Sequence, residues 1–169
     1  GITKREVNIL DAGCGEGFVV RALRRCLPHT DITGLDLSEE AIQFARENVA
    51  DAHFMVGDIN HMPFCDNYFD VVLCSEVLEH LEDPVAAIME LLRVSKKSLI
   101  ITVPHEPWFC LGNFLVLKNV KRLGNPVDHI NHWTYRSFQK YMKMHIATDN
   151  GELCFSKSFP WSIAIYSKE

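Results

Sequence analysis

"ILDAGCGEGF", residues 9–18, places three glycines at alternate positions directly after a short apolar run. Glycine is needed where a backbone turns sharply or approaches a ligand closely. Apolar positions at helical spacing follow in Phe18–Leu27, so the stretch predicts a strand, a glycine loop and the start of a helix. These parts together form a nucleotide-binding corner, and Asp11 stands two residues before its first glycine.

Strand and helix signals alternate along the rest of the chain. The expected strands are Val7–Leu10, Ile32–Leu35, Phe54–Val56, Phe69–Cys74 and Leu99–Val103, with a terminal hairpin of Leu153–Phe159 and Ser162–Tyr166. The expected helices are Phe18–Leu27, Glu39–Val49, Pro84–Val94 and a last one from the capping Thr134 to His145. This alternation predicts an α/β, Rossmann-like doubly wound sheet of seven strands, mostly parallel, with one antiparallel strand near the C-terminus. Such a sheet binds ligands at the carboxyl ends of its strands, beside the first strand.

Length and composition indicate a single soluble domain over residues 1–169. The chain is 47% hydrophobic and 23% charged, which is typical of globular proteins. Its formal net charge of −5 argues against a surface that follows nucleic-acid phosphates. The six cysteines form no C-x-x-C pair, which favours a reducing, cytoplasmic location over a disulfide framework or a zinc site. No signal peptide and no run of 18 apolar residues occurs, so we expect no membrane span.

The glycine spacing distinguishes two kinds of cofactor. A dinucleotide fingerprint, G-x-G-x-x-G, would place its third glycine at position 18, where this chain has Phe18. The pattern is instead D-x-G-x-G-x-G, from Asp11 to Gly17. With this pattern, nearly the whole chain resembles the class I S-adenosylmethionine-dependent methyltransferases, in particular the small-molecule "type 11" group.

The resemblance implies S-adenosyl-L-methionine as the cofactor and gives the glycine loop a role. In the family, the loop that here contains Gly13, Gly15 and Gly17 passes under the amino-acid part of the cofactor. That part carries an ammonium group, and the cofactor has no pyrophosphate, so an acid near the loop suits it. The resemblance therefore implies that Asp11 helps to hold the ammonium, often through water.

The ends of the next two strands supply further candidates for the cofactor site. Asp36, in "GLDLS", lies 19 residues after Gly17, about the distance expected for an acid that accepts both ribose hydroxyls. The resemblance places Leu37 on one face of the adenine. It also implies that Asp58, in "GDI", accepts from the adenine amino group, and that the backbone N–H of Ile59 meets the ring.

"CSEVLEHLEDP", residues 74–84, follows the fourth expected strand. It lacks the N-P-P-Y or D-P-P-Y signature of amide and nucleobase N-methyltransferases, which disfavours those acceptors. Glu76, Glu79 and His80 form E-x-x-E-H, which resembles a motif of ubiquinone-biosynthesis O-methyltransferases and small-RNA 2′-O-methyltransferases. In those families the motif and a later histidine hold magnesium, and His129, five residues before Thr134, has the spacing of that later ligand.

Two interpretations of this motif stay open. Two histidines among four candidate ligands would favour softer metals such as manganese, iron or zinc. However, an L-E-H ending after the fourth strand is widespread in small methyltransferases that need no metal, where the histidine lines the substrate side. We therefore expect no bound metal and a histidine-lined acceptor pocket. His80 and His129 are the expected catalytic residues, and His105 and His132 are further candidates for a base.

Residues 105–133 form an insertion between the fifth strand and the last helix. Its aromatic residues are Trp108, Phe109, Phe114 and Trp133, and it has few acids. The resemblance implies that it builds a substrate lid, although a helical hairpin packed on the sheet edge would have the same composition. Basic residues beside apolar groups also favour peripheral contact with an anionic membrane. They are Lys118, Lys121 and Arg122.

These features together predict a methyltransferase that O-methylates a small or lipid-linked hydroxyl compound by in-line displacement. The first alternative is a metal-assisted 2′-O- or catechol O-methyltransferase. The second is a catalytically silent subunit that binds the cofactor and regulates a partner. Nucleic acid is disfavoured as the general substrate because of the negative net charge.

Overall fold

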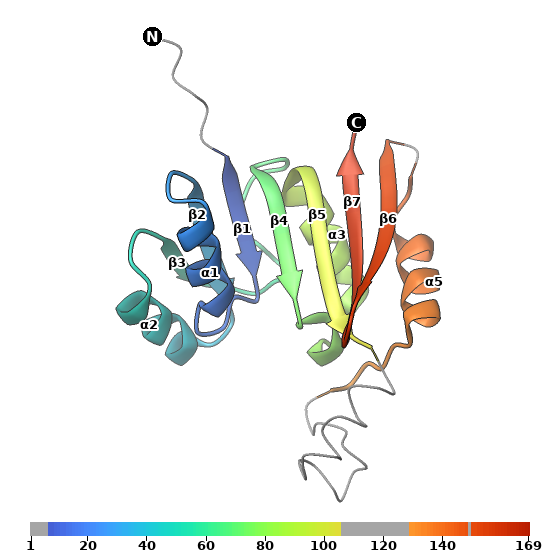
Figure 1. The fold of residues 1–169 in the computed structure, drawn as a ribbon, viewed down its shortest axis with the longest axis horizontal. Coiled ribbons are helices and arrows are strands. Elements are labelled where there is room, and N and C mark those ends of the chain that lie inside the picture. The colour runs from blue at the N-terminus through green and yellow to red at the C-terminus, as the bar shows by residue number, and fades with distance from the viewer. Residues whose placement is uncertain (1–6, 106–128, 149) are drawn as a thin grey trace, which may run out of the picture.

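A computed structural model describes residues 7–105, 129–148 and 150–169 of the chain. Its centre is a seven-stranded sheet in the order β3-β2-β1-β4-β5-β7-β6 (Figure 1). The strands are β1 (Asn8–Ala12), β2 (Asp31–Asp36), β3 (His53–Val56), β4 (Phe69–Ser75), β5 (Ser95–Pro104), β6 (Gly151–Ser158) and β7 (Trp161–Lys168). The pairs from β3 to β5 are parallel, whereas β7 runs antiparallel to both β5 and β6. The predicted doubly wound sheet with one antiparallel strand is therefore confirmed.

Helices cover both faces of the sheet. The described helices are α1 (Phe18–Cys26), α2 (Glu39–Asn48), α3 (Pro84–Val94) and α5 (Tyr135–His145), with a 3-10 turn η1 (Leu78–His80) after β4. Successive strand residues point to opposite faces. Accordingly, Ile9 belongs to the apolar cluster with α1 and α2, and its neighbour Leu10 to the larger cluster with α3 and α5. The hydrophobic pattern thus sandwiches the sheet between two layers of helix.

Side chains that the sequence places at helix starts cap three of these helices. Ser38 Oγ accepts a hydrogen bond of 3.2 Å from an amide in the first turn of α2, and Asp83 caps α3 in the same way at 3.0 Å. Pro84 occupies the first turn of α3, where its missing N–H costs nothing. Thr134 and Ser137 form a reciprocal capping box at the start of α5. These caps fix where each helix leaves the loop before it.

Every strand differs by at least one residue from its predicted bounds, and the differences in β5 and β1 change which charged residues lie within a strand. β5 begins at Ser95, four residues before the predicted Leu99, because the polar residues there hide the strand signal although they pair with β4. Lys97 in this segment forms a 2.8 Å salt bridge to the largely buried Asp70. β1 extends to Ala12, so Asp11 lies within the strand and not in the loop after it.

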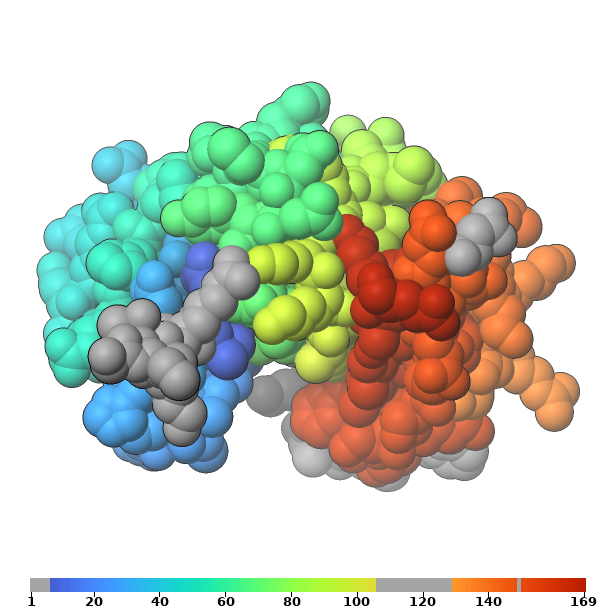
Figure 2. All heavy atoms as spheres, turned by 90° about the horizontal axis from the view of Figure 1, so that it is seen from above, coloured from blue at the N-terminus to red at the C-terminus, as the bar shows by residue number. Residues whose placement is uncertain are grey.

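The C-terminal strand β7 ends at the amino edge of the sheet, which is the edge where the parallel strands begin. Seen from above, the red end of β7 lies against the yellow start of β5 (Figure 2). The Lys168 ammonium donates to Asn67 Oδ1 at 3.0 Å, to the Leu92 carbonyl at 2.8 Å and to the Ser95 carbonyl. A single side chain therefore ties β7 to the loop before β4, the end of α3 and the start of β5.

The predicted insertion at 105–133 falls mainly on residues 106–128, which lie outside the described residues. Its lid role and the membrane contact through Lys118, Lys121 and Arg122 stay predictions. Among the helices that the structure describes, none combines the length and apolar composition that crossing a bilayer requires.

Candidate active site

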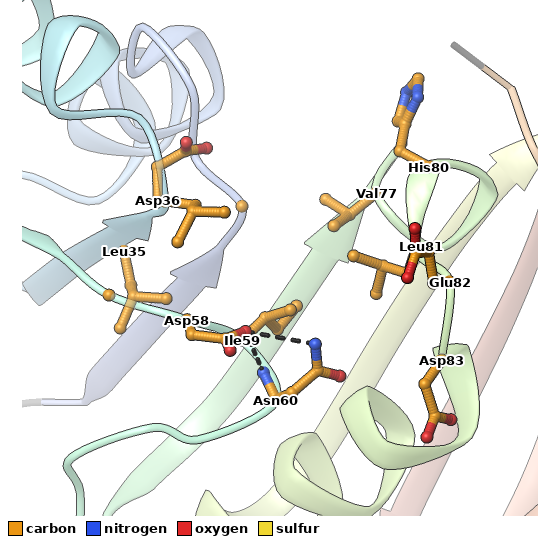
Figure 3. Close-up of a pocket in the computed structure, with 13 residues that line it drawn as sticks. Leu35, Asp36, Asp58, Ile59, Asn60, Val77, His80, Leu81, Glu82 and Asp83 are labelled. Atoms are coloured by element: carbon orange, nitrogen blue, oxygen red, sulfur yellow. Dashed lines mark hydrogen bonds between the residues drawn. The ribbon is translucent and has the colours of Figure 1, made fainter.

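A cavity of about 420 Å³ opens at the carboxyl edge of the sheet, beyond β1, β2 and β3. Six of the residues that the sequence predicts for the site line it: Gly13, Asp36, Leu37, Asp58, Ile59 and His80. In the close-up, Asp36 and Leu35 stand on one flank and Val77, His80 and Leu81 on the other, with Asp58, Ile59 and Asn60 between them (Figure 3). The switch point beside β1 therefore holds the cavity, as expected for this topology.

Asp36 joins the glycine loop to the end of β2. One carboxylate oxygen accepts a 2.7 Å hydrogen bond from the Gly15 N–H, and the other accepts a 2.9 Å bond from the Ser38 N–H. The carboxylate is half-buried, so each oxygen keeps acceptor capacity on the cavity side. Asp36 is thus held in position by two backbone amides before any ligand is present.

Gly13 and Gly17 both need a left-handed backbone, but their surroundings differ. At Gly13, with φ of 80°, a Cβ would meet a Val77 methyl at 2.3 Å, so a side chain there cannot fit under the cavity. Gly17, with φ of 78°, precedes α1, and a Cβ would meet Ala45 and Phe54 at 3.1–3.3 Å. Gly17 and Gly15 do not line the cavity. Gly17 instead allows close packing of the loop against α2 and β3.

Asp11 lies beneath the loop with only 1% of its surface exposed, and it does not line the cavity. Burial, and next the negative charge of Asp36, raise the pKa of Asp11 from 3.8 to about 7. Its Oδ2 atom is buried and has no hydrogen-bond partner among the described residues. An acceptor oxygen left in this state is costly unless a donor or cation reaches it.

Asp58 and Ile59 form the floor of the cavity beyond β3. Asp58 Oδ1 accepts 2.8 and 3.2 Å hydrogen bonds from the backbone and side-chain nitrogens of Asn60. The Asn60 backbone bond is the main reason that the pKa of Asp58 is lowered. Ile59 is buried, while Leu37 is 73% exposed on the cavity wall. A large exposed leucine at this position is available to cover a flat ring.

Glu79, His80 and His129 converge on the opposite flank. One ligand atom from each lies within 4.8 Å of the other two, and the two imidazole rings are 4.9 Å apart in an edge-to-face arrangement. Glu79 is 1% exposed, and His80 lines the cavity. The spacing in sequence is large, so the fold and not a local turn brings His129 to this motif.

Asn131 fixes His129 against η1. Its side-chain amide donates to the carbonyls of Leu78 and Leu81 at 3.1 and 2.7 Å. The Asn131 backbone N–H donates to the Glu79 carbonyl at 2.9 Å. These three bonds from one residue explain how the segment after the insertion reaches the E-x-x-E-H turn. Sequence reasoning missed Asn131, because a single asparagine carries no signal of its own.

Glu76 does not belong to the three-residue cluster, although the sequence grouped it there. Its φ of 57° turns the chain at the end of β4. The carboxylate accepts from Thr102 Oγ1 at 3.4 Å and from the Trp161 indole. Burial raises the pKa of Glu76 to about 7 against the effect of these hydrogen bonds. Left-handed backbone at a non-glycine residue is uncommon and clusters at functional sites.

The other two predicted base candidates are less central. His132 lies on the same segment as His129, with 6.4 Å between the ring centroids, and it is exposed. His105 follows β5 and stacks on Tyr135, with 6.3 Å between ring centroids, away from the cavity that His80 lines. The structure thus brings His80 and His129 together and separates His105 from them.

Comparison with known proteins gives a family for this arrangement. A family model described as a methyltransferase domain matches residues 10–101, more than half of the chain. An uncharacterised methyltransferase of Schizosaccharomyces pombe is 38% identical over 104 residues, which are 55% of this chain and 37% of that protein. The demethylmenaquinone methyltransferase of Thermotoga maritima is 37% identical over 95 residues, 54% of this chain and 42% of that protein. The chain matches less than half the length of either relative.

The fold is also that of solved methyltransferases. A plantazolicin methyltransferase, solved with a monoazolic desmethyl analogue and SAH, superposes with a TM-score of 0.80 and 20% identity over 96% of this chain and 76% of that one. At this identity the likeness concerns the fold, whereas the family model covers the glycine loop and the ends of the first four strands. The chain therefore belongs to the class I S-adenosylmethionine-dependent methyltransferases.

Proposed function

We propose that this domain transfers the methyl group of S-adenosylmethionine to a hydroxyl of a small or lipid-linked acceptor. The main support is one juxtaposition. The cavity bordered by Asp36 and Asp58 has His80 on its other flank, and His80 is in ring contact with His129. Its volume of about 420 Å³ lies in the range of small-molecule sites.

The buried acid under the glycine loop fits this cofactor. Asp11 Oδ2 has no partner among the described residues, and a carboxyl at the base of the loop suits the ammonium of the cofactor's amino-acid part. A cation there would lower the pKa of Asp11 again, because opposite charge favours the ionised form. The position between Asp11 and the cavity must be a glycine, because a Cβ at Gly13 would collide with Val77.

The remaining contacts follow the strand ends. Asp36 would accept from the ribose hydroxyls with the lone pairs that Gly15 and Ser38 leave unused. Asp58 and the Ile59 N–H would meet the adenine edge, and Leu37 would cover one of its faces. Gly17 supports the loop through packing, and Gly15 through its bond to Asp36.

Methyl transfer from a sulfonium needs little acid–base catalysis by the protein. The bound cofactor supplies an electrophilic methyl group on a sulfonium, which is a good leaving group. The chain's own task is to hold the acceptor oxygen in line with that methyl carbon and to keep water out. A hydroxyl acceptor also benefits from a base, and His80 and His129 are the imidazoles on the cavity flank that would accept its proton.

A metal-assisted reaction is a second candidate, and one observation favours it. Glu79, His80 and His129 offer one carboxylate and two imidazoles within 4.8 Å of one another, a donor set that fits a divalent transition metal. A cation held there would lower the pKa of the acceptor hydroxyl. Glu76 would not be among its ligands, because its carboxylate is held by Thr102 and Trp161.

The insertion completes the proposal. We place residues 105–133 as the lid over the acceptor within a single domain, because the segment leaves β5 beside Glu76's partner Thr102 and returns at His129. A lid rich in apolar and aromatic residues would suit a lipid-linked acceptor and peripheral contact with a membrane. The acceptor, and any lipid attached to it, would enter from this side.

Calorimetry tests the cofactor first. S-adenosylhomocysteine should bind with a one-to-one stoichiometry, and NAD should not bind. Tight binding of NAD would contradict the proposal. Binding of S-adenosylhomocysteine without methyl transfer to anything in a metabolite pool would favour the silent regulatory subunit.

Labelled cofactor then tests the chemistry. The protein is incubated with a metabolite pool and methyl-labelled S-adenosylmethionine, with and without EDTA. His80→Gln and His129→Gln should lower transfer while S-adenosylhomocysteine affinity stays within about twofold, which separates catalysis from binding. Loss of transfer in EDTA, together with manganese-dependent thermal stabilisation that His129→Gln abolishes, would select the metal-assisted reaction.

A further inference from the structure

A second cavity, of about 520 Å³, opens at the same edge of the sheet. It lies where the ends of β5 and β6 meet the start of α5 (Figure 1). Its lining residues are His105, Thr134, Tyr135, Arg136, Gln139 and Lys157. The methyl-transfer mechanism above uses none of them.

The charge of this cavity is opposite to that of the whole chain. The net charge is −5, yet Arg136 and Lys157 both line the cavity, and no described lining residue is acidic. Neither cation forms a salt bridge with a described residue. Elsewhere Arg93 and Lys97 are each within 2.9 Å of a carboxylate. The two cavity cations therefore keep their charge available.

The ring of Tyr135 holds the Lys157 side chain in place without neutralising its charge. Lys157 Nζ lies 4.2 Å from the centroid of the Tyr135 ring, within the range of a cation–π contact. His105 stacks on the same tyrosine at 18° between ring planes. A cation–π contact orders the side chain but leaves the ammonium protons free to donate. The cavity is thus lined by hydrogen-bond donors, one of which, the Lys157 ammonium, is already held in position.

We infer that this cavity binds an acidic group of the methyl acceptor, a carboxylate or a phosphate. The inference rests on the proposed function, because it concerns the acceptor of that reaction. Arginine and lysine are the residues that recognise such groups by charge-assisted hydrogen bonds. The hydroxyls of Thr134 and Tyr135 and the Gln139 amide are further donors on the wall.

The position suits a two-point attachment of the acceptor. His129 and Thr134 are five residues apart in the chain, so their Cα atoms lie within about 18 Å of each other. An acceptor with its acidic group in this cavity would therefore place a hydroxyl near His129 when the spacer between the two groups matches a distance within this bound. The cavity would fix the orientation of the acceptor, and hence which of several hydroxyls receives the methyl group.

Inorganic phosphate is the probe for the test. Amide spectra of the ¹⁵N-labelled chain are recorded during a phosphate titration at constant ionic strength, with chloride as the balancing anion. We expect saturable shifts at Tyr135, Arg136 and Lys157. Arg136→Gln or Lys157→Gln should weaken binding about fivefold or more, since each removes a charge-assisted bond, and the double variant should show no saturation. Lys140→Gln is the matched control: it removes one positive charge one turn further along α5, outside the cavity.

The outcomes separate this inference from the proposed function. Phosphate shifts that the double variant retains, or that Lys140→Gln removes equally, overturn the inference. Failure of the wild type to bind S-adenosylhomocysteine in parallel calorimetry would instead overturn the proposed function. Vesicles of phosphatidylcholine with and without phosphatidic acid identify the source of the phosphate. Sedimentation with the anionic vesicles that the double variant loses points to a lipid headgroup, and phosphate saturation without sedimentation points to a soluble acceptor.

Discussion

Four acids, two at each edge of the sheet, differ in how the fold holds their charges. At the amino edge, charged groups are paired: Lys97 holds the pKa of Asp70 below its ordinary value, and Arg93 does the same for Glu90. At the carboxyl edge, burial raises the pKa of both Asp11 and Glu76 to about 7, with no cation beside either among the described residues. Asp70 and Glu90 thus add stability when they are ionised, whereas Asp11 and Glu76 reduce it.

The difference indicates where the chain does its chemistry. Paired charges at the amino edge need no ligand to be satisfied, so they serve the fold. Buried acids without a cation mark candidates for a site that a ligand or a reacting group completes, and Asp11 and Glu76 each lie within two residues of one that lines the cavity. The variants below therefore separate binding at one edge from stability at the other.

Asp36→Ala should have the largest effect on binding. It frees the Gly15 and Ser38 amides and, under the proposed function, removes charge-assisted bonds to the ribose. S-adenosylhomocysteine affinity, measured by calorimetry, should therefore fall by about 2–4 kcal/mol. The control is Asp31→Ala at the other end of the same strand, which should bind like the wild type. Equal affinities for Asp36→Ala and wild type would show that Asp36 does not hold the ribose.

Asp11→Asn should make the protein more stable and bind less tightly. A raised folded-state pKa adds stability that is fully present below 3.8, the pKa of the unfolded chain, and is lost as the pH rises through about 7. The asparagine variant escapes this loss, so urea unfolding should show it about 2–4 kcal/mol more stable than wild type at pH 8. The gap should close as the pH is lowered toward 4. A gap independent of pH would contradict the burial of an ionisable Asp11.

The same variant should lose affinity for S-adenosylhomocysteine, about tenfold at pH 8, because under the proposed function the ammonium loses its anionic partner. Stability and affinity would then move in opposite directions at one residue. Unchanged affinity would indicate that Asp11 shapes the loop without facing the ligand's ammonium.

Arg93→Ala should destabilise the amino edge and leave binding alone. Its guanidinium bonds Glu90 at 2.6 Å and Asp66 at 2.9 Å, and it also donates to two backbone carbonyls of the loop before β4. We expect a loss of about 2–3 kcal/mol in the free energy of unfolding, since several partly buried acceptors lose their donor. Affinity for S-adenosylhomocysteine should stay within twofold of wild type, and a larger change would mean that the two edges are coupled.

Asp31→Ala should have the smallest effect. Its partner His53 lies 3.6 Å away, and both side chains are more than half exposed, so solvent screens the pair. The change in unfolding free energy should be below about 0.5 kcal/mol. Chemical unfolding curves that superpose on those of the wild type would agree with this, and a shift as large as that of Arg93→Ala would not.

The sheet and the cofactor side could be predicted because strand signals also mark where strands end. Asp36 and Asp58 each stand at the last residue of a strand or just beyond it, and parallel strands end at one edge. The position of Asp36 and the presence of the cavity therefore follow from local patterns. The role of Gly17 in packing does not, because only the fold brings Ala45 and Phe54 against it.

The flank of the cavity that carries Glu79, His80 and His129 could be predicted only in part. The E-x-x-E-H spacing grouped Glu76 with Glu79 and His80, but the left-handed turn at Glu76 sends its carboxylate toward β5 and β7. Backbone dihedrals of single residues are not visible in a spacing pattern. The cavity of Arg136 and Lys157 was missed for a related reason, since its walls come from segments far apart in the sequence.

The contact between Trp161 and Glu76 links the intrinsic fluorescence of the protein to the ionisation of Glu76. The indole that donates to this carboxylate is 39% exposed, whereas that of Trp133 is 7% exposed. Indole emission responds to a nearby charge, so protonation of Glu76 should change the fluorescence of Trp161, one of the three tryptophans of the chain. The titration of Glu76 can thus be followed by tryptophan fluorescence without any added label.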